Sequence, residues 1–154
     1  MHTYAHMDLI PIYEGLADVN RLRIVHLLSQ GPLPVKHLQG ILGISQVRVS
    51  KHLAYLRKRG MVEVDRNRNW MIYRLPALPS AELTAQVRCL AECASGMPIL
   101  DADLVARRAI QAEVDQIAAS GERSEPTLVA APSTSSQPAA NVGWGLQEDD
   151  GYVD

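Results

Sequence analysis

The 154-residue sequence contains only two cysteines, Cys89 and Cys93, and no long run of apolar residues. Two cysteines cannot form a disulfide framework, and their scarcity fits a reducing compartment. The longest apolar runs span a handful of residues, which excludes a membrane-spanning helix. The N-terminal residues have neither the basic start nor the apolar core of a signal peptide. We therefore expect a cytoplasmic protein with no membrane partner.

A second absence is local and concerns acidic residues. The segment 45–60, SQVRVSKHLAYLRKRG, contains five Lys or Arg residues and no Asp or Glu. A solvated surface helix normally carries both signs of charge, so this segment is expected to meet an anion. Residues 1–79 hold 11 basic against 5 acidic residues, and residues 80–154 hold 4 against 12. The formal net charge of −2 therefore hides a basic first half, which is the candidate anion-binding half.

The spacing of apolar residues predicts four helices in the first 60 residues. Two of them lie near residues 9–16 and 20–30. The third is PVKHLQGILG, about two turns long and stopped by Gly43. The fourth is the basic segment, which Ser45 caps and Gly60 closes. A short helix, a turn of about three residues and a longer helix form the helix-turn-helix pattern.

A β-hairpin is expected directly after the basic helix. MVEVD alternates apolar and polar residues, RNRN makes a turn, and WMIYRL gives a second strand. Asn67 and Asn69 tolerate the positive φ that such a turn can need. The hairpin forms a wing with Arg66 and Arg68 at its tip. The fold class is therefore mainly α with a small β-hairpin, a winged helix-turn-helix.

The second half is expected to add two helices and a tail. Leu83, Val87, Leu90 and Ala94 share one helical face, and a final helix covers residues 101–119. Beyond this helix Ser, Pro, Ala and Gly dominate, and the sequence ends acidic. This composition predicts a disordered tail.

The segments LADVNRLRIVHLLSQG, LGISQVRVSKHLAYLRKRGMVEVDR and WMIYRL together resemble the ArsR/SmtB family, the small winged-helix repressors that respond to metals, metalloids or redox signals. The resemblance spans roughly residues 10–95, and LGISQ…VSKHL…LRKRGMV is its specific part. It implies a homodimer, paired through its terminal helices, that binds operator DNA and is released by an inducer. We accordingly divide the chain into a DNA-binding and dimerisation domain, 1–98, an additional C-terminal helix, 99–119, and a disordered acidic tail, 120–154.

The family's DNA-binding positions can be transferred residue by residue. The base-reading face falls on Gln46, Ser50 and Lys51, with Val47 placed to touch a thymine methyl. Phosphate contacts are expected from a second set, whose members are basic. This set comprises Arg48, His52, Arg57, Lys58, Arg66 and Arg68. Two of its members have alternative roles: His52 in a hydrogen bond within the domain, and Lys58 as a favourable charge at the helix C-terminus.

Two inducer sites that the resemblance suggests cannot form in this chain. Where arsenic- and cadmium-responsive members carry ELCVCDL, this sequence has PLPVKHL, so Pro34 and Lys36 stand at the two cysteine positions. The Asp and His ligands of zinc and nickel sensors on the last helix are also missing, because no histidine follows His52. The remaining candidate is RCLAEC, in which Cys89 and Cys93 are one helical turn apart.

A thiol pair at this spacing suits a soft ion that takes two ligands. The sequence therefore predicts no obligatory cofactor but an inducer at Cys89 and Cys93, with trivalent arsenic or an organoarsenical favoured. A redox switch is one alternative, and simple packing at a helix edge is another. The third thiolate that inorganic arsenite usually takes is not available within one chain.

Two other classes of protein can be compared with this prediction. An enzyme would need a nucleophile or a paired acid and base, and the histidines lie in the DNA-binding half, away from Cys89 in sequence. A winged-helix module that binds protein has no need of a helix with five basic residues and no acid. We therefore expect a DNA-binding repressor and not an enzyme, with a ligand-independent repressor and a protein-interaction module as alternatives.

Overall fold

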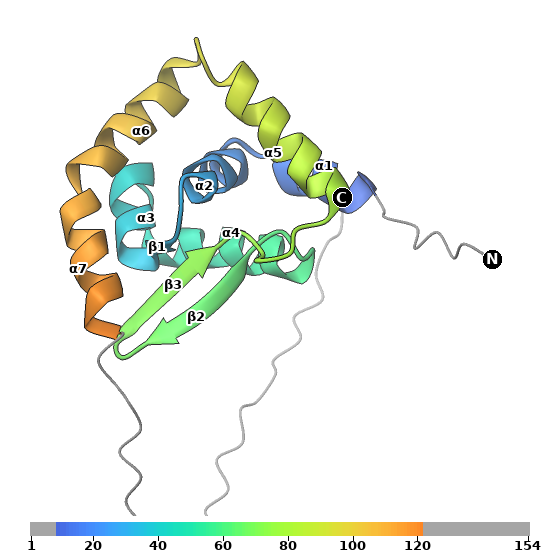
Figure 1. Ribbon diagram of the computed structural model, residues 1–154. Coiled ribbons are helices and arrows are strands. Elements are labelled where there is room, and N and C mark those ends of the chain that lie inside the picture. Colours follow the sequence, from blue (N-terminus) through green and yellow to red (C-terminus); the bar gives the residue numbers. More distant parts are fainter. Residues whose placement is uncertain (1–8, 122–154) are drawn as a thin grey trace, which may run out of the picture. The chain divides into compact units, whose positions relative to one another are not determined.

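The structure, a computed structural model, describes residues 9–121, which form seven helices and a three-stranded sheet (Figure 1). The helices are α1 Leu9–Leu16, α2 Val19–Ser29, α3 Val35–Leu42, α4 Gln46–Lys58, α5 Ala81–Cys93, α6 Pro98–Ala109 and α7 Gln111–Gly121. The strands are β1 Leu33–Pro34, β2 Glu63–Asn67 and β3 Trp70–Arg74. The predicted acidic tail, 120–154, lies outside the described residues except for its first two. None of the helices in the described range has the length and apolar character that crossing a bilayer requires.

Helices α3 and α4 form the predicted helix-turn-helix, and local signals set its boundaries. Gly43 has a φ of 67° and ends α3, because glycine adopts this left-handed conformation without steric cost. Ser45 then caps α4, its hydroxyl accepting a hydrogen bond from the Arg48 amide. Gly60, also with a φ of 67°, follows the end of α4 and turns the chain toward β2. The predicted turn and both ends of the basic helix are confirmed.

The apolar core lies around α2, which packs against α1, α3, α4, α5 and α6. Its central residues are almost fully buried, and so is one face of α4. Val49, Leu53 and Leu56 have no exposed surface, because their spacing of three and four residues places them on one helical face. The opposite face of α4 therefore remains in solvent.

The wing is the antiparallel pair β2 and β3, and β1 lies on the other side of β3. The hairpin register pairs Asn67 with Trp70, which leaves two residues for the turn. The positive φ of the turn, 52°, falls on Arg68 and not on Asn67 or Asn69, the two residues that would tolerate it best. Register decides this position, since the first residue of a two-residue hairpin turn takes a positive φ. Strand β1 is too short to show an alternating pattern and is not predicted from the sequence.

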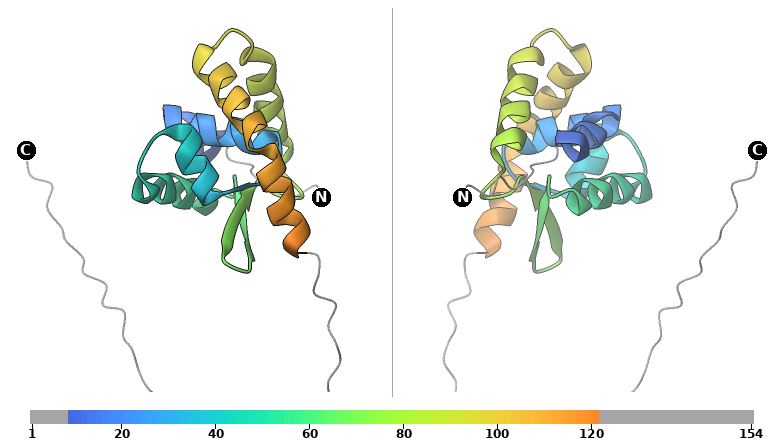
Figure 2. Two further views of the ribbon diagram at one scale, coloured as in Figure 1. Left: turned by 90° about the vertical axis from the view of Figure 1, so that its left-hand side faces the viewer. Right: turned by 90° about the vertical axis from the view of Figure 1, so that its right-hand side faces the viewer.

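The C-terminal segment forms two helices, not the single helix predicted for residues 101–119. Helices α6 and α7 meet at Ile110, whose φ of −104° and ψ of 2° are not helical. The break lets α6 follow α2 and α3 while α7 runs beside the wing (Figure 1 and Figure 2). Val114 and Ile117 of α7 are buried, and the Asn67 amide of the wing donates to the Ile117 carbonyl at 3.3 Å.

A buried ion pair links α6 to the helix-turn-helix. Arg23 of α2 donates two hydrogen bonds to Asp103 of α6, with Nε to Oδ2 at 2.8 Å and Nη2 to Oδ1 at 2.7 Å. The same guanidinium donates to the carbonyl oxygens of Ile41 and Leu42 at the C-terminal end of α3. Asp103 is only 3% exposed, and its hydrogen bonds raise the pKa of Arg23. One charged group therefore connects three helices.

A buried histidine near the end of α2 predicts a pH dependence of stability. Burial lowers the pKa of His26 below its ordinary value of about 6.5, although the charges of Asp103 and Asp101 oppose this. Below that pH the unfolded chain binds a proton at His26 that the folded chain does not. We expect the free energy of unfolding to decrease as pH falls through about 6.5, by at most about 1.4 kcal/mol per pH unit from this residue.

Urea unfolding on both sides of pH 6.5 measures this decrease. The variant His26→Gln cannot titrate, so its stability should depend less on pH than that of the wild type. His52→Gln, at a less buried position, is the comparison variant. An identical pH profile for His26→Gln and the wild type would contradict the prediction.

Candidate nucleic-acid interface and thiol pair

The outward face of α4 carries the residues predicted to read bases. Gln46, Val47, Ser50 and Lys51 are all exposed, and Val47 keeps 64% of its surface accessible. They occupy the first two turns of α4, and the N-terminal residues of a recognition helix are the ones that contact base edges. The helix is therefore oriented in the domain with this set outward.

The predicted phosphate-binding residues of α4 differ in their surroundings. Arg48, Arg57 and Lys58 are exposed, whereas the His52 side chain is only 16% exposed. Its Nδ1 atom lies 3.7 Å from Oδ1 of Asp18, the residue that caps α2. Burial alone would raise the pKa of Asp18, but hydrogen bonds from backbone amides and the charge of His52 lower it overall. His52 thus has an acidic neighbour inside the domain, which favours its alternative role.

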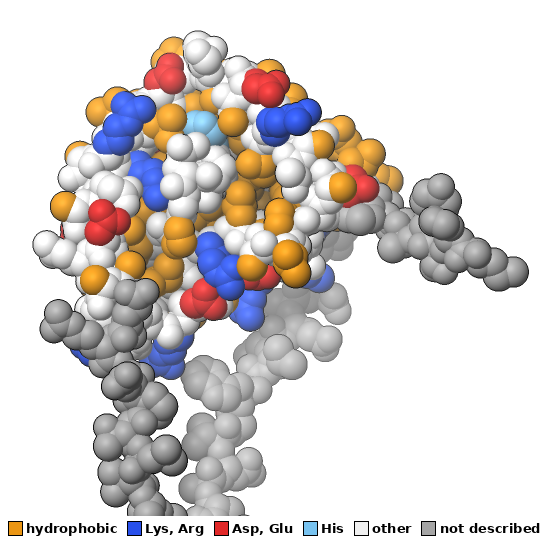
Figure 3. Space-filling model, in the orientation of Figure 1, with side chains coloured by type: hydrophobic (Ala, Val, Ile, Leu, Met, Phe, Trp, Pro, Cys, Tyr) orange, Lys and Arg blue, Asp and Glu red, His pale blue; other side chains and the backbone are white. Residues whose placement is uncertain are grey.

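The fifth basic residue of the segment, Arg59, is occupied within the protein. Its guanidinium stacks 3.4 Å from the centroid of the Tyr55 ring, and Nη2 donates to Oε2 of Glu14 at 3.0 Å. The exposed cations of α4 are then Arg48, Lys51, Arg57 and Lys58. The molecular face drawn in Figure 3 differs from the outward face of α4 in its charge. Lys and Arg are interspersed there with Asp and Glu, and apolar side chains cover much of its centre.

The tip of the wing is also basic, because the acids of β2 pair with a residue of β3. Nη1 of Arg74 lies 2.8 Å from Oε2 of Glu63, and its Nε lies 2.7 Å from Oδ2 of Asp65. Arg66 and Arg68 are exposed, and Nε of Arg66 donates to the Arg68 carbonyl at 3.4 Å. The hairpin therefore presents two cations at its end.

Helix α5 carries both cysteines on its exposed side. The Sγ atoms of Cys89 and Cys93 lie 4.0 Å apart. The hydrogen bond with Cys89 raises the pKa of Cys93. The charge of a Cys89 thiolate raises it further, because two adjacent thiolates repel each other. Within residues 9–121, no group of three or more His, Cys, Asp or Glu side chains is arranged to hold a metal ion. The pair thus offers two sulfur ligands to an ion that needs two.

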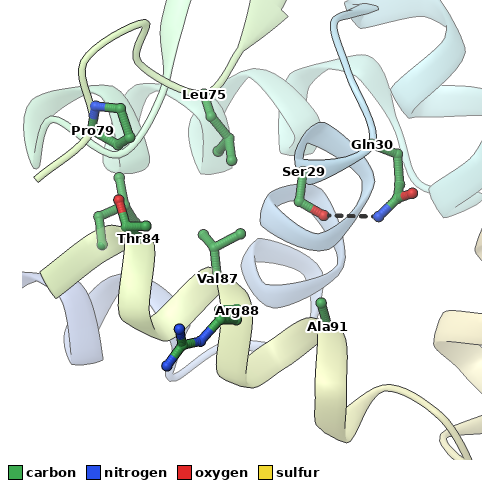
Figure 4. A pocket seen from close by; sticks show the side chains of 9 residues that line it. Ser29, Gln30, Leu75, Pro79, Thr84, Val87, Arg88 and Ala91 are labelled. Atoms are coloured by element: carbon green, nitrogen blue, oxygen red, sulfur yellow. Dashed lines mark hydrogen bonds between the residues drawn. The ribbon is translucent and has the colours of Figure 1, made fainter. Parts of the chain in front are cut away.

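A pocket of about 290 Å³ lies between α2, α5 and the segment that connects β3 to α5 (Figure 4). Figure 4 shows Leu75 and Val87 pointing toward each other from its two sides, with Arg88 at the rim. On the α2 side, the amide of Gln30 donates to the Ser29 hydroxyl at 3.2 Å. Neither cysteine lines this pocket, so the pocket and the thiol pair are separate features of α5.

The structure also brings together two polar residues that no sequence pattern connects. Nε2 of His37 in α3 lies 3.6 Å from Oε1 of Glu113 in α7. His37 stands directly before Leu38 of the buried face and is itself only 7% exposed. A histidine beside the buried face of a helix can be recognised in the sequence as a candidate buried polar residue. Its partner, Glu113, cannot be recognised in this way, because it lies on a helix far away in the chain.

The sequence is similar to those of known bacterial regulators. The sequence profile of a family described as "Bacterial regulatory protein, arsR family" matches residues 18–64. The arsenic resistance transcriptional regulator ArsR2 of Pseudomonas putida is 42% identical over 71 residues, which are 45% of this chain and 62% of that protein. The arsenical resistance operon repressor of Escherichia coli is 42% identical over 73 residues, 46% of this chain and 62% of the repressor. The chain therefore spans less than two thirds of the length of either relative.

A solved structure extends the similarity over more of a relative's length. HlyU from Vibrio cholerae aligns with a TM-score of 0.50 at 30% sequence identity, covering 55% of this chain and 88% of HlyU. By sequence alone, the transcriptional activator HlyU is 31% identical over 81 residues, which are 53% of this chain and 72% of HlyU. This likeness agrees with the mainly helical fold and small antiparallel sheet described above.

Proposed function

Because the chain belongs to the ArsR family of bacterial regulatory proteins, we propose that it is a transcriptional regulator that binds operator DNA through α4. The relatives named above are regulators of transcription rather than enzymes. The observation that carries the proposal is the outward face of α4, the second helix of a helix-turn-helix, which exposes four cations and no acid. Such a surface matches the phosphates and acceptor-rich base edges of a major groove.

The residues of this surface divide into two roles. Gln46, Ser50 and Lys51 contact base edges, and Val47 contacts a thymine methyl group. The basic residues around them contact phosphates and supply affinity without sequence preference. These are Arg48, Arg57 and Lys58 of α4 and Arg66 and Arg68 of the wing, with His52 as a sixth member. The burial of His52 beside Asp18 makes it the least accessible of the set.

Replacing Arg66 and Arg68 of the wing with glutamine should weaken binding to every DNA sequence by a similar factor. For each phosphate that the protein no longer neutralises, the slope of log affinity against log salt should become shallower by about 0.9. Fluorescence anisotropy titrations between low and physiological salt measure the slope. Arg108→Gln, which removes an exposed cation from α6, is the matched control and should leave the slope unchanged. An unaltered slope in the double variant would remove the wing from the DNA interface.

We propose that the protein acts as a homodimer that pairs through the terminal helices of the 1–98 domain, α1 and α5. Apolar side chains on this surface support the proposal: Leu9, Ile10 and Tyr13 of α1 are 42%, 64% and 53% exposed, and Leu78 before α5 is 93% exposed. Gln86 of α5 donates to the Tyr13 hydroxyl at 3.4 Å, so the two helices form one surface. A two-fold dimer presents two copies of α4 and fits a near-palindromic operator.

The division of the chain follows from these roles. We propose that residues 1–98 carry DNA binding and dimerisation, and that residues 99–119 add a C-terminal element that supports the helix-turn-helix. The ion pair between Arg23 and Asp103 supports that second role. The proposed acidic tail, 120–154, falls outside the described residues except for its first two. A regulator of bacterial operators acts beside the chromosome, so we propose a cytoplasmic location.

We further propose that the protein is a repressor, released from DNA when a thiol-reactive inducer binds Cys89 and Cys93. Two exposed sulfurs 4.0 Å apart, without a third ligand in the described chain, fit an organoarsenical that takes two thiolates better than inorganic arsenite, which usually takes three. A ligand that bridges the sulfurs also replaces the hydrogen bond with Cys89 and the charge repulsion that together raise the pKa of Cys93. Relatives that are named for arsenic resistance support this choice of inducer.

The test is DNA release by defined agents. The reduced protein is bound to DNA from upstream of its own coding region and treated with phenylarsine oxide, arsenite, cadmium or peroxide. We expect phenylarsine oxide to release the wild type at least about ten-fold more effectively than Cys89→Ser or Cys93→Ser, because each variant keeps one ligand only. The untreated variants should bind DNA as the wild type does, which controls for damage to the fold.

The other results identify the alternatives. Release by peroxide alone, with both variants insensitive, would favour a redox-sensing repressor. DNA binding that no agent relieves would favour a ligand-independent repressor in which the cysteines only pack. Failure to bind any DNA, even at low salt where electrostatic binding is strongest, would favour a winged-helix module that binds protein.

A further inference from the structure

Helices α3, α6 and α7 lie side by side (Figure 1). Residues of all three line a pocket of about 420 Å³ that is open to solvent. This volume lies in the range of small-molecule sites. Its walls are mostly apolar and come from Gly40 and Ile41 on one side and from Ala106, Ala109 and Ile110 on the other. Its polar groups are Lys36, His37 and Glu113. The pocket is separate from the thiol pair and from the outward face of α4.

A buried polar atom lies beside this pocket. The side chain of His37 is 93% buried, and no residue in the described part of the chain hydrogen-bonds to its Nε2 atom. The nearest carboxylate oxygen, Oε1 of Glu113, lies 3.6 Å away, which is too far for a hydrogen bond. The ring of His37 stacks on Trp70 with parallel planes, so its direction is fixed. A buried polar atom without a partner costs free energy, which a ligand in the pocket can recover.

Lys36 and Glu113 bring one charge of each sign to the pocket, so the pocket offers no excess charge to an ionic ligand. A neutral ligand needs no such counter-charge. The Nε2 atom has almost no surface open to solvent, so the exposed side chain of Glu113 must turn aside before a ligand reaches it. A hydroxyl oxygen can then lie about 2.8 Å from Nε2, accepting from Nε2–H while its own hydrogen is donated to the Glu113 carboxylate. The polar end of the pocket is therefore suited to one hydroxyl group.

The apolar walls require more than a water molecule. A single water would occupy about 30 Å³ and leave most of the pocket unfilled. The facing residues Gly40, Ala106 and Ala109 are small, and a Cβ atom built on Gly40 would touch nothing within 4 Å. This spacing leaves room for a flat apolar body between α3 and α6.

We propose that the pocket binds a small neutral molecule with an apolar, preferably aromatic, body and one hydroxyl group, and that His37 and Glu113 hold the hydroxyl. Phenol is the simplest member of this class. The proposal rests on the geometry of α3, α6 and α7 alone, so it stands or fails independently of DNA binding and of the thiol pair.

Amide chemical shifts of the full chain during titration with phenol and with toluene provide the test. Toluene has nearly the same shape and lacks the hydroxyl. We expect phenol to bind at least about five-fold more tightly than toluene, with shifts concentrated in α3, α6 and α7. In His37→Phe, which keeps a ring against Trp70 but has no ring nitrogen, this preference should disappear. Glu113→Gln tests the second contact at an exposed position, where the fold is not at risk.

A pair of matched variants tests the walls of the pocket. Ala106→Leu fills the space and should abolish binding of both compounds, while Ala102→Leu, on the same helix but outside the pocket, should change neither. Thermal melting of every variant shows whether it folds. Equal affinities for phenol and toluene, a phenol preference that survives both His37→Phe and Glu113→Gln, unchanged binding in Ala106→Leu, or no shifts at millimolar phenol would each overturn the proposal.

Discussion

Replacing Asp103 with alanine is expected to lower the free energy of unfolding by about 3–5 kcal/mol. The substitution leaves the guanidinium of Arg23 buried without its counter-charge. The carbonyl oxygens of Ile41 and Leu42 that Arg23 also contacts lie at 3.3 Å and carry only partial charges, so they do not compensate. Urea unfolding followed by circular dichroism measures the loss. Because Arg23 connects α2, α3 and α6, we also expect the helix-turn-helix to lose protection against amide exchange.

Two further variants separate the ion pair from a general effect of α6. Asp101→Ala removes an exposed acid from the first turn of the same helix and should cost less than about 1 kcal/mol. Replacing both partners, Arg23→Met with Asp103→Leu, should restore much of the stability, since no unpaired charge remains buried. Equal losses for Asp101→Ala and Asp103→Ala would mean that the pair is solvated in solution.

The second large effect is expected at the base-reading face of α4. Gln46→Ala and Ser50→Ala should each weaken binding to the operator by about 1–3 kcal/mol, because each removes hydrogen bonds to base edges. Binding to unrelated DNA should change little, since phosphate contacts supply that affinity. Anisotropy titrations with operator and scrambled DNA at one salt concentration measure both quantities.

Lys58→Ala provides the comparison for these variants. This residue is exposed in the last turn of α4 and is assigned to phosphates, so its loss should weaken both DNAs by the same factor. If Gln46→Ala and Ser50→Ala also weaken both DNAs equally, the base-reading assignment is incorrect and both residues belong to the phosphate-binding set.

The helix-turn-helix could be predicted from the sequence because its determinants are local. The spacing of Val49, Leu53 and Leu56 fixes the buried face of α4, and Ser45 and Gly60 mark its ends. Once that face is known, the exposure of the remaining side chains follows from helical geometry. The outward position of the candidate base-reading residues could therefore be inferred without coordinates, although their contacts with DNA could not.

Other features depend on segments far apart in the chain. Arg23 and Asp103 are each ordinary charged residues in the sequence, and only the packing of α6 against α2 makes them a buried pair. Tertiary packing also breaks the predicted final helix at Ile110, since α6 and α7 follow different surfaces. His52 has two interpretations for the same reason: its neighbour Asp18 is on another helix. Local patterns cannot supply such information.

The three-stranded sheet has two edges, and neither invites pairing with a second molecule. One edge is β1, which has only two residues, one of them a proline without an amide hydrogen. The other is β2, whose Glu63, Asp65 and Arg66 place charges of both signs along the strand. Short strands, proline and charge are the features that keep exposed sheet edges from aggregating. The sheet should therefore not pair edge to edge with a second molecule, even at high protein concentration. The basic tip of the wing then stays accessible.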